Sequence, residues 1–213
     1  MSFREHFLSR LEALPSRESF TFPPQALPDR YSAAAVLLAF WPVGEDGVQL
    51  VFTRRPDTLP SHPGQVSFPG GGMSSADDSP MQTAIREARE ELGIDPAGVR
   101  IMGRLDDAWS FAGHHIIPYV GWLERAPELH PCPSEVKEVI VADVDVLMRP
   151  ETTCTHTFQA ESEILSTPAF RWEGGYVWGL TADILLELLL WVQCKPSGRG
   201  EARLQRMRSR LLR

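Results

Sequence analysis

The chain has 213 residues, a formal net charge of -7 and 43% hydrophobic residues, which is typical of a globular protein with an ordinary core. The acidic balance argues against a general nucleic-acid binder. The most apolar run, Ile184 to Val192, is too short to span a bilayer and contains Glu187, so no membrane segment is expected. The three cysteines have neither metal-binding spacing nor a paired framework, which favours a reducing, cytoplasmic compartment.

Hydrophobic periodicity predicts a helix at the amino end, then mostly strands, then a long apolar helix. We expect one domain over residues 1–213, with a helical extension at about 1–28 and a basic tail at about 195–213. This order of elements predicts an α/β fold, an α/β/α sandwich with a mixed sheet. The expected elements are a helix over Phe3–Leu14, strands over Ala33–Trp41, Val48–Arg54, Val99–Leu105, Ile116–Leu123, Val139–Leu147 (leading into a short helix), Thr155–Gln159, Phe170–Trp172 and Tyr176–Trp178, and a final helix capped by Thr181.

The stretch from Gly70 to Ile94 holds three consecutive glycines and then a short helix. Asp78 or Ser79 can cap the first turn, Pro80 suits the first helical position, and Gly93 ends the helix. Glycines allow close backbone approach, so this loop can present carbonyl groups to a metal or amides to a phosphate.

The helix after this loop carries Glu87, Glu90 and Glu91 close together. Like charges at neighbouring helical positions repel, and acids near a helix carboxyl end oppose its dipole. A hard divalent cation such as Mg²⁺ reverses this penalty, because it binds several carboxylate oxygens at once. Arg86 lies one turn before Glu90 and is well placed to pair with it. A solvated acidic helix face is the alternative for such a run taken alone.

This stretch resembles the Nudix box, which runs Gly, five residues, Glu, seven residues, Arg-Glu-apolar-any-Glu-Glu-any-Gly-apolar. Asp78 stands where the box has its first Glu and is expected to act as a helix cap. The resemblance implies the Nudix fold and a pyrophosphohydrolase dependent on Mg²⁺ or Mn²⁺. The residues that match the box at its spacing are Gly72, Arg86, Glu87, Ala88, Glu90, Glu91, Gly93 and Ile94.

The segment before the box resembles the signature of one Nudix subgroup, the coenzyme A pyrophosphatases. Arginine guanidinium groups suit phosphate oxygens, so Arg54 and Arg55 are candidates to bind substrate phosphates. We expect His62, Gln65 and Gly70 to contribute to the same substrate site. The matching residues are Thr53, Arg54, Arg55, His62, Gly64, Gln65, Phe68, Pro69, Gly70 and Gly71. A resemblance to the subgroup returns at Tyr176–Ala182.

The predicted metal ligands are Glu87, Glu90, Glu91 and, as the resemblance implies, the backbone carbonyl of Gly71. Either Glu91 or Glu90 is expected to act as the general base, with Arg86 orienting Glu90. Nudix enzymes often use a later acid as well, for which Glu135 and Glu138 are the two candidates; a solvated strand edge is the alternative.

The resemblance implies a small-molecule substrate, coenzyme A or one of its thioesters, cleaved to 4′-phosphopantetheine and 3′-phosphoadenosine 5′-phosphate. The alternatives are a Nudix hydrolase acting on NADH, ADP-ribose or an oxidised nucleotide, and a Nudix-fold binding module without turnover. Trp109 or Phe111 could stack on a base or belong to the core. The sequence is compatible with a homodimer and does not determine the oligomeric state.

Overall fold

The computed structural model describes residues 1–14, 31–58, 62–110, 113–160 and 163–195. Residues 15–28 of the expected extension, Phe111 and almost all of the basic tail lie outside these ranges. The helices are α1 (Phe3–Glu12), α2 (Pro80–Leu92), α3 (Val144–Leu147) and α4 (Gly179–Val192), with 3-10 turns η2 (Pro96–Gly98) and η3 (Pro150–Thr152). The strands are β1 (Ser32–Val43), β2 (Gly47–Arg54), β3 (Val66–Ser67), β4 (Gly70–Gly72), β5 (Val99–Arg104), β6 (Ala108–Trp109), β7 (His114–Leu123), β8 (Glu138–Asp143), β9 (Thr153–Ala160), β10 (Glu163–Trp172) and β11 (Gly175–Trp178).

The central sheet is mixed and has the order β3-β2-β1-β7-β5. Strands β1 and β7 run parallel, whereas β2, β4 and β5 pair antiparallel with their neighbours. Strand β4 takes a place beside the first half of β1, where Ala35 lies between Gly71 on one side and Ile117 on the other. This register brings the glycine loop into the sheet.

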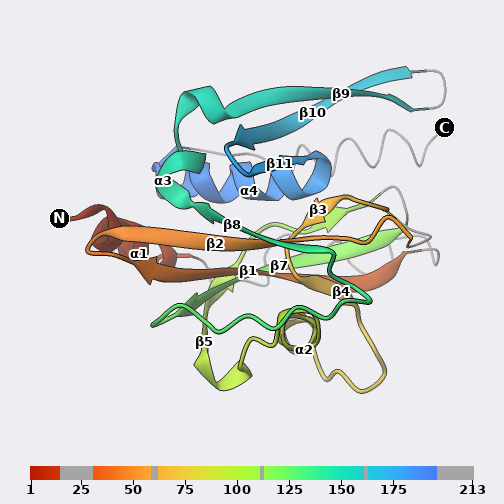
Figure 1. The fold of residues 1–213 in the computed structure, drawn as a ribbon, viewed down its shortest axis with the longest axis horizontal. Coiled ribbons are helices and arrows are strands. Elements are labelled where there is room, and N and C mark those ends of the chain that lie inside the picture. Colours follow the sequence, from red (N-terminus) through yellow and green to blue (C-terminus); the bar gives the residue numbers. More distant parts are fainter. Residues whose placement is uncertain (15–30, 59–61, 111–112, 161–162, 196–213) are drawn as a thin grey trace.

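Helices cover both faces of the central sheet (Figure 1). Helix α2 packs on one face, where Ala84, Ala88 and Leu92 meet Ala35 and Leu37 of β1. Helices α1 and α4 pack on the opposite face with the larger core, which contains most of the buried aromatic side chains. The predicted α/β/α sandwich with a mixed sheet is therefore confirmed.

A second sheet, with the order β11-β10-β9, lies outside this sandwich. Figure 1 shows it above α4, so that α4 lies between the two sheets. This position explains why α4 is apolar around most of its circumference. The sequence correctly indicated strands within β9, β10 and β11, but it did not indicate that they form a separate sheet.

The start of α4 differs from the prediction, because Trp178, and not Thr181, is its N-cap residue. Gly179 has a positive φ of 70°, which turns the chain directly from β11 into the helix. Its backbone N–H donates to the Thr167 hydroxyl on β10, so a neighbouring strand satisfies the first amide of the helix. Among the described helices, none has both the length and the apolar composition to cross a membrane.

The amino-terminal helix packs onto the domain core. It runs over Phe3–Glu12 and begins with a capping box between Ser2 and Glu5. Phe7 and Leu11 are completely buried in the larger core. The first part of the expected extension is thus integrated with the fold.

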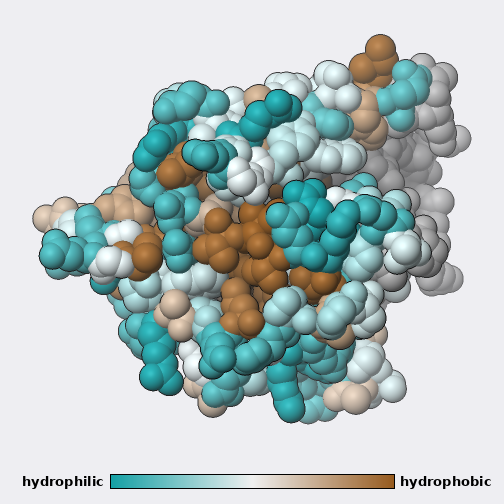
Figure 2. All heavy atoms as spheres, viewed as in Figure 1, coloured by the Kyte–Doolittle hydropathy of each residue, from teal (hydrophilic) through white to brown (hydrophobic). Residues whose placement is uncertain are grey.

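Strand β8 forms an edge of the central sheet, because β2 is its partner among the described strands. Figure 2 shows a hydrophobic patch at the centre of the view, in the place where β8 runs in Figure 1. Val141 of β8 is 40% exposed. The acidic residues Glu138 and Asp143 stand at the two ends of the strand, an arrangement that disfavours pairing with another sheet edge.

Candidate metal centre

The glycine loop approaches the sheet and α2 more closely than side chains would allow. A Cβ atom at Gly70 would lie 2.4 Å from the Ala35 carbonyl oxygen of β1. A Cβ atom at Gly71 would lie 2.6 Å from the carboxyl carbon of Glu87. Glycine at position 71 therefore lets the Glu87 carboxylate rest directly against the loop backbone.

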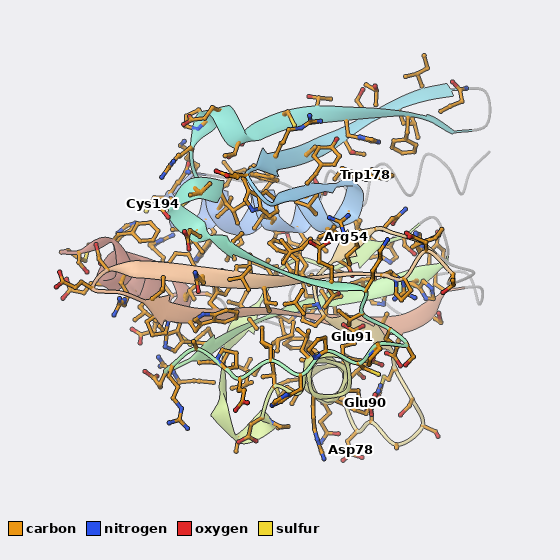
Figure 3. All side chains as sticks on the ribbon, in the orientation of Figure 1. Arg54, Asp78, Glu90, Glu91, Trp178 and Cys194 are labelled. Atoms are coloured by element: carbon orange, nitrogen blue, oxygen red, sulfur yellow. The ribbon has the colours of Figure 1, made fainter. Side chains whose placement is uncertain are left out.

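Three glutamates converge beside this loop. Among the described residues, Glu87 and Glu91 of α2 and Glu135 have carboxylate oxygens that all lie within 4.8 Å of one another. Glu91 is only 4% exposed, and Figure 3 shows it between α2 and the central sheet. Glu87 and Glu91 have an i, i+4 spacing on α2, which explains how one helix supplies two of the three acids.

Burial and mutual repulsion shift the acidity of these groups. Burial raises the pKa of Glu91 to about 8, with further upward contributions from Glu87 and Glu135. Arg55 and the backbone N–H of Gly70 act in the opposite direction on the Glu91 pKa. Burial also raises the pKa of Glu87, which Arg86 partly counteracts. Ionising all three acids is therefore costly without an added positive charge.

Arg86 links the loop to the acids of α2, and its predicted ion pair with Glu90 is confirmed at 2.7 Å. It also contacts Glu87 at 2.9 Å and the Gly72 carbonyl oxygen at 3.1 Å. Its principal partner is Asp77, which accepts bonds of 2.9 and 3.0 Å from two guanidinium nitrogens. Hydrogen bonding from Arg86 holds the pKa of Asp77 well below its usual range.

Asp78 does not cap α2 as we expected. Ser79 is the N-cap residue, and its hydroxyl accepts a bond from the backbone N–H of Gln82. Asp78 instead exchanges bonds with the Gln82 side chain. Its neighbour Asp77 contacts Arg86 because the bend at residues 73–79 directs Asp77 towards the helix. Asp77 was missed because the motif spacing places the acid at position 78.

Glu90 lies outside the group of three carboxylates. It is adjacent to Glu91 in sequence, so its side chain is turned by about 100° around the helix. Its side chain is 53% exposed and is held by Arg86. Figure 3 shows Glu90 farther from the sheet than Glu91. The predicted roles of Glu90 as ligand or base therefore have no support from this arrangement.

The two candidates for the later acid have different partners. Glu135 joins Glu87 and Glu91, whereas Glu138 pairs with Arg54 at 2.6 Å. The pairing of β2 with β8 places Arg54 opposite Glu138, which fixes this contact. Sequence reasoning had no means to choose between the two acids, since strand register decides it.

The two neighbouring arginines lie on opposite faces of the sheet. Arg54 follows the buried Phe52 by two positions and shares its face, which is that of the larger core. Figure 3 shows Arg54 on the side of the sheet away from Glu91. Arg55 has the opposite orientation and interacts electrostatically with Glu91. Only Arg55 therefore lies beside the carboxylates.

The other predicted substrate residues lie along the segment between β2 and β4. The backbone N–H of Arg55 donates to the Gln65 carbonyl oxygen at 3.0 Å, and that of Gln65 to His62. His62 is exposed and has a positive φ of 54°. Gly70 bonds Glu91 through its backbone. Of these residues, Gly70 is thus in direct contact with the acidic group.

A second buried acid, Asp107, lies between β5 and β6. One of its carboxylate oxygens pairs with Arg104, and the other lies 2.7 Å from His115 Nε2. Trp109 stacks on His115 with nearly parallel rings. His114 instead contacts Ser32, so the two adjacent histidines have different partners. Trp109 belongs to this packed cluster.

The donor set at the first cluster fits a hard divalent cation. Carboxylate oxygens are the ligands that Mg²⁺ and Mn²⁺ prefer. Glu91 Oε2 is buried and has no hydrogen-bond partner among the described residues. A divalent cation at this position would satisfy a buried carboxylate oxygen that lies next to two further acids.

Comparison with known proteins identifies the family of the chain. A family model described as NUDIX domain matches residues 31–160. The chain belongs to the Nudix family. It is 33% identical to Nudix hydrolase 22, chloroplastic, of Arabidopsis thaliana, over 91% of this chain and 67% of that protein. It is 31% identical to an uncharacterized Nudix hydrolase, NudL, of Pectobacterium atrosepticum, over 85% of this chain and 94% of the relative.

A solved structure has the same fold. The MutT/nudix family protein from Enterococcus faecalis aligns with a TM-score of 0.55 and 16% identity, covering 92% of this chain and 78% of that one. Nudix hydrolases cleave phosphoric anhydride bonds, and this protein is an enzyme of that class.

Proposed function

We propose that the protein is a metal-dependent coenzyme A pyrophosphatase, and that Glu87, Glu91 and Glu135 hold its cation. The convergence of these three carboxylates around an unsatisfied Glu91 oxygen is the observation that supports the metal centre. The Gly71 backbone is proposed as a further ligand, because Glu87 rests directly against it. The cation would be Mg²⁺ or Mn²⁺.

The reaction adds water across the diphosphate and breaks one anhydride P–O bond. A bound divalent cation neutralises the charge of the diphosphate and acidifies water. Glu91, whose Oε2 atom has no hydrogen-bond partner among the described residues, takes the proton of the attacking water, while Arg86 holds the neighbouring Glu90 away from the group. Arg55, on the same face as the acids, binds phosphate oxygens of the substrate.

The identity of the substrate rests on the segment from Thr53 to Gly71, which resembles the coenzyme A subgroup. Cleavage of coenzyme A would yield 4′-phosphopantetheine and 3′-phosphoadenosine 5′-phosphate. We also propose a single domain, a cytoplasmic location and a homodimer as the working description of the protein. The cytoplasmic location is proposed from the cysteine pattern. It is not taken from the plant relative, whose name includes the word chloroplastic.

Hydrolysis assays on the full chain test this proposal. Coenzyme A, acetyl-coenzyme A, NADH and ADP-ribose are compared at equal concentration with Mg²⁺ or Mn²⁺, and Glu91→Gln serves as the control for contaminating hydrolases. We expect turnover of coenzyme A or its thioester to exceed that of the other two compounds. Turnover of NADH or ADP-ribose alone would overturn the substrate. Cation binding without turnover of any compound would indicate a binding module.

A further inference from the structure

Residues 124–137 connect β7 to β8 and run across the carboxyl end of α2; we call this segment the strap (Figure 1). The His130 and Cys132 backbone amides donate to the Leu92 and Glu91 carbonyl oxygens, each at 2.8 Å. The strap therefore satisfies carbonyl groups that the end of a helix leaves open.

The strap is held at few places. Val136 is 4% exposed and packs with the core beneath α2, and Leu129 packs there in part. Gly93 allows the close passage, because a Cβ atom at that position would lie 3.1 Å from His130 Cβ. Most other strap residues are exposed. Segments with few buried contacts are the ones that open most readily.

The strap also carries Glu135, so its docking has an electrostatic cost. In its docked position Glu135 faces Glu87 and Glu91, and the three acids repel one another. The carboxyl end of α2 adds further negative potential. Among the described interactions of the strap, the repulsion of Glu135 by Glu87 and Glu91 is the one that opposes docking.

A cation would reverse the sign of this interaction. The buried Oε2 atom of Glu91 has no hydrogen-bond partner in the described structure, which independently indicates a ligand at this position. A ligand that binds the docked state and not the open state stabilises the docked state by mass action. Glu135 is the only one of the three acids that lies on the strap, so it transmits this effect.

The far end of the strap contacts the segment that bears Arg55. The Lys137 backbone amide donates to the Arg54 carbonyl oxygen at 2.8 Å, and its ammonium group pairs with Asp57. These two contacts connect the position of the strap to the position of residues 54–57. Ordering of the strap would therefore also order the residues on either side of Arg55.

We propose that the strap is a metal-sensitive element, which docks on α2 when a divalent cation bridges Glu135 to Glu87 and Glu91 and loosens when the cation leaves. This inference rests on the metal centre of the proposed function. It does not depend on which anhydride is cleaved. Binding of the cation would then order both the strap and the residues around Arg55, so that the substrate binds to a site that is already assembled.

Hydrogen exchange of the full chain, in EDTA and in Mg²⁺ or Mn²⁺, tests the strap without any substrate. We expect the cation to slow exchange of the strap amides by about tenfold or more in the native chain, with little change in the β9–β10 hairpin. Glu135→Gln should abolish this protection. Glu128→Gln is the matched control, since Glu128 lies on the same strap and is 88% exposed; it should keep the response.

The outcomes separate the strap from the enzyme. If a cation raises the melting temperature and supports turnover but leaves hydrogen exchange of the strap amides unchanged, the proposal of metal-sensitive docking is wrong and the metal centre stands. Full protection in Glu135→Gln would also overturn this docking proposal. A cation that neither stabilises the chain nor protects the strap would overturn the metal centre, and the strap with it.

Discussion

Glu91 and Asp107 are both buried acids, at 4% and 1% exposure, but their surroundings are opposite. Asp107 has Arg104 on one oxygen and His115 on the other. Glu91 has two further acids beside it and an oxygen without a hydrogen-bond partner among the described residues. The chain pairs the first charge by itself, whereas the second lies where the proposed cation would bind.

The contrast shows how a functional site can be distinguished from a structural one. A buried charge persists only if it is paired, coordinated or neutralised by a proton. Asp107 is paired within the fold, so it stabilises the bend between β5 and β6. Glu91 has two repelling acids beside it and an unpartnered Oε2 atom, at a cost in stability that is typical of a residue kept for binding or catalysis.

Replacing Glu91 should have the largest effect on activity. Glu91→Gln removes a charge and little volume, and we expect turnover to fall by roughly 10²–10⁴-fold. The cation-free variant should melt at the same temperature as the native chain or higher, because one repelling charge is gone. Steady-state kinetics and a thermal melt measure the two effects. A melting temperature that collapses together with activity would assign Glu91 a structural role.

Replacing Asp107 should have the opposite profile. Asp107→Asn leaves Arg104 buried without its anionic partner, and breaking such a pair costs about 3–5 kcal/mol of unfolding free energy. Turnover per folded molecule should change little. Denaturant unfolding compares this variant with Asp145→Asn, which breaks an exposed pair with Arg149 and should cost less than about 1 kcal/mol. Equal costs would contradict the contrast.

The raised pKa of Glu91 should be visible in the pH dependence of the free energy of unfolding. Because the folded pKa of Glu91 is about 8 and its ordinary value is 4.5, its contribution is present below pH 4.5 and is lost as pH rises through 8. In EDTA the native chain should therefore lose stability over this range relative to Glu91→Gln, on the order of a few kcal/mol. Added Mg²⁺ should reduce the loss at high pH, since it holds the ionised carboxylate. Parallel pH profiles would refute this.

Asp77 and Asp78 are adjacent, so they allow a matched comparison. Asp77→Asn removes the charge that orients Arg86, and we expect metal affinity or turnover to fall by about 10–100-fold. Asp78→Asn should change neither by more than a few-fold, because its contacts are with Gln82. Titration calorimetry with Mn²⁺ and kinetics measure both. A larger effect for Asp78 would restore the assignment from motif spacing.

The smallest expected effect separates the two arginines. Arg55→Ala should raise KM by about tenfold or less with a smaller change in kcat, since Arg55 lies beside the acids and is proposed to bind phosphate. Arg54→Ala should have a weaker effect on KM, because Arg54 pairs with Glu138 on the opposite face. Equal increases in KM would show that both arginines reach the substrate.

Local signals were sufficient for the central helix. Pro80 and Gly93 mark its ends, and the pair of Glu87 and Glu91 follows from helical spacing alone. The strands were also recognised where apolar residues run continuously, as in β1 and β7. The start of α4 was misjudged at Thr181 because the actual partner of the first amide, Thr167, lies on another strand.

The amino-acid sequence by itself determined three things: the order of elements indicated the sandwich, the match to the Nudix box indicated the class of enzyme, and helical spacing placed two of the acids on one helix. Only the tertiary structure decided that Asp77 orients Arg86, that Glu135 and not Glu138 joins the group, and that Arg55 and not Arg54 faces it. Strand register and loop path set these contacts, and both are properties of the folded sheet. The repulsion of Glu91 by two other acids is visible only once those neighbours are in place.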